Sequence, residues 1–187
     1  MNVEAGWTSP VLHELWAERN ATRAALEGEV RGLSDAQLAF RPGARRWSIG
    51  EIVDHICLSE RSITRTVSRL FQQAAGLGQI WIAAEGERPG AAIDRDRYAR
   101  PARAPESVCP MPERFLDSLL SDLSESRERF EEVARRVDGK AVGPVCLPHF
   151  QLGPLNIFQW IAVVGAHEAR HLDAIRRIKA DPQFPRA

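Results

Sequence analysis

The chain has 187 residues, the length of a single domain, and 44% of them are hydrophobic while 27% are charged. This composition is typical of a globular protein and excludes a disordered or fibrous one. Lysine and arginine together number 25 and aspartate and glutamate also number 25, so the formal net charge is zero. A neutral chain lacks the broad positive surface of proteins that bind nucleic acids or anionic membranes, so we expect neither partner.

Apolar stretches and cysteines bear on where the protein resides. The longest apolar stretch, residues 160–166, is too short to span a bilayer. The first 14 residues mix acidic and aromatic side chains and do not resemble a signal peptide. Cys57, Cys109 and Cys146 lie at unrelated spacings, which does not fit a disulfide framework. We therefore expect a cytoplasmic protein with free thiols, most of them buried.

Four segments carry the periodicity of an amphipathic helix, and no segment of similar length alternates as a half-buried strand does. The first segment begins at Ser9–Pro10, a hydroxyl N-cap followed by proline, and should end at Gly32. The second segment begins with Ser48 and Glu51, whose spacing predicts a capping box, and its apolar face continues to Phe71.

A long connection separates these two helices from the next two. Residues 74–112 are rich in glycine, proline, alanine and arginine and lack sustained periodicity. A third helix is predicted over residues 115–137, and after a loop at 140–153 a fourth opens near Pro154 and stops before Pro182. The predicted fold is all-α: a four-helix bundle in one domain over the whole chain, with a long crossover connection between helices 2 and 3.

Three of the five histidines fall on apolar faces of the predicted helices. His167 and His171 are four residues apart, so they project from one side of the fourth helix and can chelate one metal ion. His55 lies at the edge of the inward face of the second helix. Burying three imidazoles without partners would cost about 1–3 kcal/mol each, whereas one divalent cation would satisfy all three acceptor nitrogens. We predict metal ligands here; the alternative is three hydrogen-bonded core histidines.

The stretch from His167 to His171 also matches the H-E-x-x-H pattern of zinc metalloproteases, in which Glu168 would be the general base. The extended pattern would need glycine and histidine where this chain has Ala174 and Arg177, and no glutamate follows Glu168. We therefore expect the third ligand to come from upstream. Glu168 is expected to face solvent or to lie outside the ligand set, with an acid–base role as the alternative.

Cys146 and His149 form a C-x-x-H pair in a loop that contains proline. With His167 and His171, this pair could close a structural zinc site of four protein ligands. A single pair of this kind is a weak signal, so the three-histidine site is the expectation.

Residues 46–55, with the sequence RWSIGEIVDH, together with His167-x-x-x-His171 resemble the DinB-like family of four-helix bundles, which is related to bacillithiol transferases. The resemblance covers nearly the whole chain. It implies that His55, His167 and His171 bind one divalent metal ion, zinc or nickel, with open coordination positions facing a cleft. It also implies a homodimer.

Three neutral histidines with open positions on the cation are more typical of a catalytic than of a structural site. Such a metal lowers the pKa of bound water or holds a thiol as its thiolate, and either would be the nucleophile. By resemblance to DinB-like relatives, the leading hypothesis is an enzyme that transfers a low-molecular-weight thiol to an electrophilic small-molecule substrate, or catalyses a related thiol-assisted reaction. Two alternatives stay open: a hydrolase with Glu168 or another acid as base, and a metal-stabilised binding module without catalysis.

Overall fold

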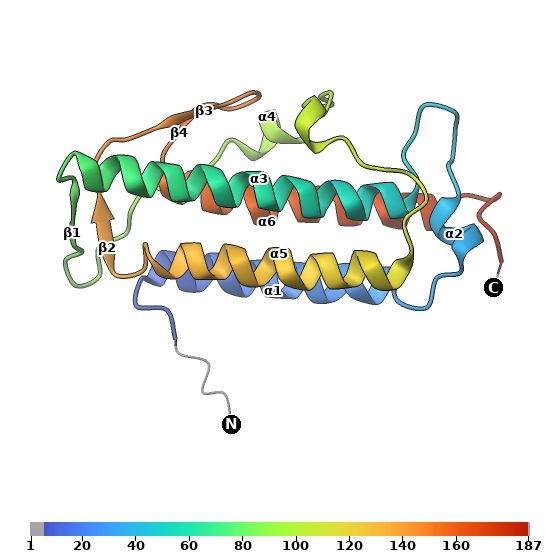
Figure 1. The fold of residues 1–187 in the computed structure, drawn as a ribbon, viewed down its shortest axis with the longest axis horizontal. Coiled ribbons are helices and arrows are strands. Elements are labelled where there is room, and N and C mark those ends of the chain that lie inside the picture. The colour runs from blue at the N-terminus through green and yellow to red at the C-terminus, as the bar shows by residue number, and fades with distance from the viewer. Residues whose placement is uncertain (1–5, 187) are drawn as a thin grey trace.

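Four long helices form a bundle in the computed structural model, which describes residues 6–186 (Figure 1). They are α1 (Pro10–Val30), α3 (Ile49–Gly76), α5 (Leu116–Arg135) and α6 (Ile157–Lys179). The shorter elements are α2 (Asp35–Ala39), α4 (Arg95–Ala99), the 3-10 helix η1 (Glu106–Val108), β1 (Ile80–Ile82), β2 (Lys140–Val142), β3 (Leu147–His149) and β4 (Gly153–Leu155). The predicted all-helical core is thus confirmed, with small strands added to it.

Side-chain caps fix where three of the long helices begin. The Ser9 hydroxyl accepts from the backbone N–H of Leu12 at the start of α1. At the start of α3 the predicted capping box is present, because Ser48 and Glu51 each accept from the other's backbone N–H. Asn156 and Gln159 form a second box at the start of α6. These bonds satisfy amide donors that a helix start otherwise leaves unpaired.

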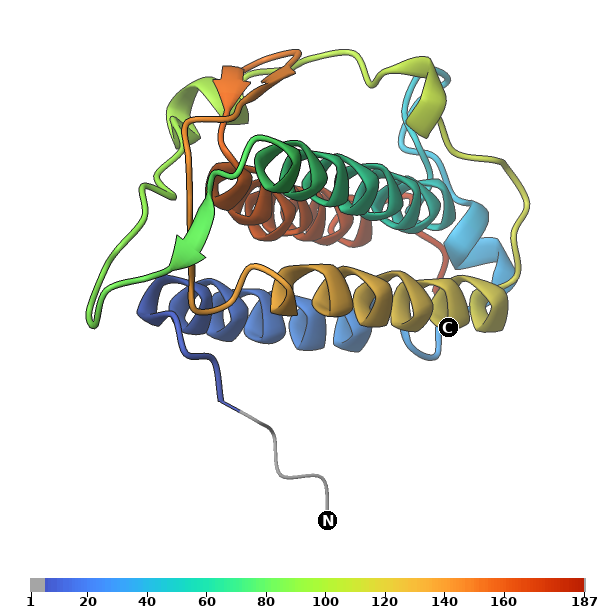
Figure 2. The ribbon, with the colours of Figure 1, turned by 60° about the vertical axis from the view of Figure 1, so that its left-hand side comes forward.

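Helix α3 lies between α5 and α6, and α6 in turn packs against α1. The colour gradient in Figure 1 shows that α3 and α5 run in the same direction, so residues 77–115 must return along the bundle before α5 begins. Figure 2 shows this connection arching over the side of the bundle formed by α3 and α6. The predicted crossover without secondary structure is not confirmed in that form, because the connection contains β1, α4 and η1.

The four strands form two antiparallel pairs that the sequence analysis did not expect. Ile80 of β1 lies opposite Val142 of β2, and Leu147 of β3 lies opposite Leu155 of β4. Three residues are too few to display an alternating pattern, which explains why periodicity missed them. Because β4 occupies residues 153–155, α6 begins at Ile157 and not near Pro154.

The core between the helices consists of two clusters of buried apolar side chains. Fully buried members of the two clusters include Leu12, Phe130, Leu26, Ile49, Leu119 and Ile175. Of the cysteines only Cys57 is buried, while Cys109 and Cys146 are exposed, so the expectation of mostly buried thiols was wrong. Within residues 6–186, no helix combines the length and the apolar character that a membrane crossing requires.

A buried set of charged side chains joins the four long helices. Arg23 of α1 donates to Glu168 of α6 at 2.5 Å, to Glu60 of α3 at 3.1 Å and to the backbone carbonyl of Leu123 in α5 at 2.8 Å. Arg19 of α1 also pairs with Glu60. Two guanidinium groups and two carboxylates are therefore removed from water together, which keeps the buried charges in balance.

Candidate metal centre

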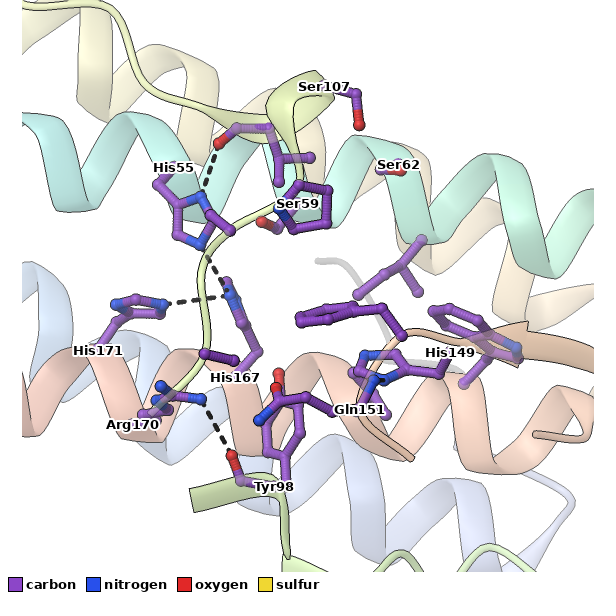
Figure 3. Close-up of a pocket in the computed structure, with 18 of the residues that line it drawn as sticks. His55, Ser59, Ser62, Tyr98, Ser107, His149, Gln151, His167, Arg170 and His171 are labelled. Carbon is purple, nitrogen blue, oxygen red and sulfur yellow. Dashed lines mark hydrogen bonds between the residues drawn. The ribbon is translucent and has the colours of Figure 1, made fainter. Parts of the chain in front are cut away.

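Three imidazole rings from two helices converge at one point, as Figure 3 shows. His167 and His171 come from α6 and His55 comes from the adjacent α3. The Nε2 atom of His167 lies 3.1 Å from Nε2 of His55 and 3.2 Å from Nε2 of His171. The three potential ligand atoms all lie within 4.8 Å of one another, so the structure brings together the three histidines that the sequence singled out.

The His55 ring is held by two neighbours from other segments. Its Nδ1 lies 2.7 Å from the carbonyl oxygen of Val108, which can only accept, so we assign the ring proton to Nδ1. The Trp47 ring lies against the other side, with 4.7 Å between ring centroids. As a result the lone pair of His55 Nε2 faces the two histidines of α6. A backbone carbonyl that orients a histidine in this way is a common partner of metal ligands.

Hydrogen bonds alone do not satisfy the three nitrogens, and the two separations from His167 are close to those in a zinc site, while the ligand atoms of His55 and His171 lie within 4.8 Å of each other. With His55 Nε2 as an acceptor, His167 Nε2 carries at most one proton and cannot satisfy both of its neighbours. Two nitrogens bound at about 2.0–2.1 Å to a tetrahedral zinc ion lie about 3.3 Å apart. The observed separations of 3.1 and 3.2 Å are close to that value.

All three imidazoles are held in the neutral form that a metal ligand requires. Burial lowers the pKa of His171 to about 3, with smaller contributions from the nearby His55 and from the positive charge of Arg170. Burial is also the main cause of the lowered pKa of His55 and of the strongly lowered pKa of His167. These rings therefore do not need to lose a proton near neutral pH before they bind a cation.

The histidines line a pocket of about 170 Å³. Its walls come from α3, α6, the connection between α3 and α5, and the turn between β3 and β4. Trp160 of α6 and Phe150 of the turn supply large apolar surfaces, and Arg170 is the charged side chain of the wall. A small, mostly apolar cavity with a few polar groups is the usual form of a small-molecule site.

Glu168 lies elsewhere than expected. It is 1% exposed, and both of its carboxylate oxygens accept from Arg23 in the core of the bundle. It is not among the residues that line the pocket. Of the two expected placements, solvent exposure was wrong, whereas Glu168 does lie outside the cluster of His55, His167 and His171. Its pairing with Arg23 gives no support to a role as general base.

The C-x-x-H pair is also separated from the centre. Cys146 is exposed and is not part of the cluster that His55, His167 and His171 form. His149 is buried and lines the pocket, and its Nδ1 accepts from the backbone N–H groups of Gln151 and Leu152. Cys146 therefore does not complete a four-ligand site with His149, His167 and His171.

Comparison with known proteins places the fold and the centre in a family. A model of the DinB superfamily matches residues 19–175. The chain belongs to the DinB superfamily. The matched range includes all three histidines of the centre.

Two individual proteins are similar to this DinB superfamily chain. Uncharacterized protein YuaE of Bacillus subtilis (strain 168) is 29% identical over 161 residues, which cover 86% of this chain and 94% of YuaE. The crystal structure of TT2238, a four-helix bundle protein, matches with a TM-score of 0.61 and 22% identity over 88% of this chain and 97% of that chain. The second likeness shows the four-helix-bundle fold alone.

Sequence reasoning missed several residues of the pocket. Val108, Tyr98 and His149 come from segments without helical periodicity, and what places them is the path of the chain between helices. The position of Arg170 in the pocket could have been predicted. Arg170 lies three residues after His167 on the same helix, and residues with this spacing are neighbours on the helix surface.

Proposed function

We propose that this protein is a divalent-metal-dependent enzyme that transfers a low-molecular-weight thiol to an electrophilic small molecule. The observation that supports it is the convergence of three imidazole Nε2 atoms on one side of a mostly apolar pocket. Three protein ligands leave room on the cation for a further ligand, which is typical of catalytic zinc. Zinc or nickel is the proposed metal, because both bind imidazole readily.

The chain's own residues have definable tasks in this reaction. Val108 holds the proton of His55 at Nδ1 and so keeps Nε2 available. Trp47, Trp160 and Phe150 give the pocket apolar walls that would contact the electrophile. When bound, the cation would supply Lewis acidity that lowers the pKa of a thiol. In the transfer the thiol proton passes to solvent, a carbon–sulfur bond forms and the bond to the leaving group breaks with its electrons.

Metal content is the first test. We expect about one equivalent of zinc or nickel by plasma mass spectrometry in protein purified without an affinity tag, and none in His171→Ala. The matched control is His13→Ala, because His13 is an exposed histidine on α1. A parent protein that holds no metal after incubation with zinc or nickel would overturn the proposal and favour a role as a binding module.

Product analysis separates transfer from hydrolysis. Metal-loaded protein is incubated with an electrophile in the presence and absence of a low-molecular-weight thiol, and the products are identified by mass spectrometry. A thioether that forms only with thiol supports the proposal, and a hydrolysed product that forms without thiol contradicts it.

Two further expectations belong to the same proposal, a homodimer and a cytoplasmic location. Light scattering tests the homodimer, and fractionation of cells tests the location.

A further inference from the structure

One wall of the pocket carries hydrogen-bond donors without a carboxylate to neutralise them. Arg170 is the single charged side chain among the residues that line the pocket, and no aspartate or glutamate lines it within residues 6–186. Arg170 is only partly exposed to water, and a guanidinium that is partly desolvated in a mostly apolar cavity gains from an anionic partner. The structure therefore contains an unmatched positive charge beside the three histidines.

The guanidinium of Arg170 is positioned by Tyr98. Its Nη1 donates to the Tyr98 carbonyl oxygen at 3.0 Å, and its central carbon lies 5.9 Å from the centroid of the Tyr98 ring (Figure 3). Within the described part of the chain Arg170 forms no ion pair with a carboxylate. The remaining N–H groups of a guanidinium suit a planar oxyanion, to which two parallel hydrogen bonds can be donated.

His149 adds a second donor to the pocket. Its Nδ1 accepts from the backbone N–H groups of Gln151 at 3.2 Å and Leu152 at 3.3 Å, so the neutral ring carries its proton on Nε2. No residue between 6 and 186 accepts from that Nε2–H. The ring is 7% exposed and is wedged against Tyr98 and Trp160, with centroid distances of 5.8 and 5.1 Å. The ring therefore has a fixed orientation, and its Nε2–H is a donor with an open partner position in the pocket wall.

We infer that Arg170 forms an oxyanion subsite, so the pocket selects a substrate or cosubstrate that carries a carboxylate. The carboxylate would accept from the guanidinium of Arg170, while the apolar part of the molecule contacts Trp160 and Phe150 and His149 Nε2–H is left to donate to another polar group of the same molecule. The inference rests on the proposed function in one respect, since it takes this pocket to be the substrate site. Arg170 acts here as a binding residue that determines specificity, and His149 supplies a separate hydrogen-bond donor on the pocket wall.

The test compares two probes of the same shape, benzoate and benzamide, by calorimetric titration of the full chain as purified. We expect benzoate to bind at least about tenfold more tightly, which is the scale of one charge-assisted hydrogen bond. Arg170→Gln should reduce this preference to within about twofold, and Arg170→Lys should keep part of it. His149→Phe keeps Arg170 and should therefore keep the preference for benzoate over benzamide.

Two controls separate the subsite from the metal and from general charge. Arg177→Gln removes an exposed arginine from the same helix and should leave the preference unchanged. Titrations repeated after dialysis against a chelator should still favour benzoate, because Arg170 remains. A preference that persists in Arg170→Gln and disappears with the chelator would assign the selectivity to the metal and overturn the inference, as would equal or undetectable binding of both probes.

The outcomes also distinguish this inference from the proposed function. Benzoate selectivity that depends on Arg170, in a protein that forms no thioether with any thiol, would support the subsite and contradict the transferase. Thioether formation with neutral and carboxylate electrophiles at equal rates would support the transferase and contradict the subsite.

Discussion

His149 links the pocket to the pH dependence of folding. Burial lowers its pKa to about 4, whereas an imidazole in an unfolded chain titrates near 6.5. Between these pH values the unfolded chain binds a proton that the folded chain does not. The stabilisation from neutral His149 is therefore complete above pH 6.5 and is lost as the pH falls toward 4, by up to about 3 kcal/mol.

Denaturant titrations of wild type and His149→Phe at several pH values between 7 and 4 measure this effect. Phenylalanine cannot accept from the backbone N–H groups of Gln151 and Leu152, so the variant should be less stable than the wild type at pH 7. Its free energy of unfolding should nevertheless fall less steeply with decreasing pH than that of the wild type. If the free energy of unfolding fell equally with pH in the two proteins, His149 would have the same pKa in the folded and the unfolded chain.

Arg23 is the residue whose loss should cost the most stability outside the apolar core. Arg23→Met leaves the Glu168 carboxylate buried without its partner and removes one partner of Glu60. Breaking a buried ion pair from one side typically costs about 3–5 kcal/mol. We expect a loss of that size in denaturant unfolding at pH 7, against less than about 0.5 kcal/mol for the exposed Arg177→Met. A loss below about 1 kcal/mol would mean that water or rearrangement compensates the two carboxylates.

The metal centre was predictable from single residues because it depends on helical spacing. His167 and His171 share a face whatever the rest of the chain does, and His55 lies on the only other helix face with a histidine directed inward. The fate of Glu168 was not predictable in the same way. A position on a helix gives the direction of a side chain, but the partner Arg23 is 145 residues away and is known only once α1 and α6 are packed together.

At the scale of the element, the start of α3 determines how firmly His55 is held. His55 lies seven residues after the cap at Ser48. Ser48→Ala removes the acceptor for the backbone N–H of Glu51 and should cost about 1 kcal/mol of unfolding free energy. Ser68→Ala, in the interior of the same helix, should be neutral or slightly stabilising, because alanine has the higher helix propensity. Equal effects of the two substitutions in thermal unfolding would contradict the role of the cap.

The long helices were predictable as elements, while the short elements were not. Ser48 and Glu51 mark the beginning of α3, and the apolar positions after them repeat over seven turns. By contrast β3 and β4 contain Pro148 and Pro154 opposite each other, residues that argue against a strand when the sequence is considered alone. Their pairing depends on how the connection between α5 and α6 folds against the helices, which the local sequence does not reveal.

At the scale of the whole molecule, the three-histidine cluster joins α3 to α6, so a cation bound there would link the two helices. A cation that binds the folded chain alone stabilises it by about 2.7 kcal/mol when its free concentration is 100 times its dissociation constant. We therefore expect a chelator to lower the melting temperature of the wild type measured by circular dichroism. His171→Ala should melt at the same temperature with and without chelator, and His13→Ala should respond as the wild type does. A wild type that is insensitive to the chelator would mean that the cation contributes nothing to the packing of α3 on α6.

The parallel direction of α3 and α5 has a consequence for how such a protein can diversify. It requires residues 77–115 to travel the length of the bundle, and six residues of the pocket, among them Tyr98 and Val108, belong to that stretch. Doubling the length of a flexible loop costs only about 0.6 kcal/mol. Insertions and substitutions there can therefore change which molecules fit the pocket while the core and the three histidines stay intact. The topology separates the part of the chain that adapts to a substrate from the part that folds.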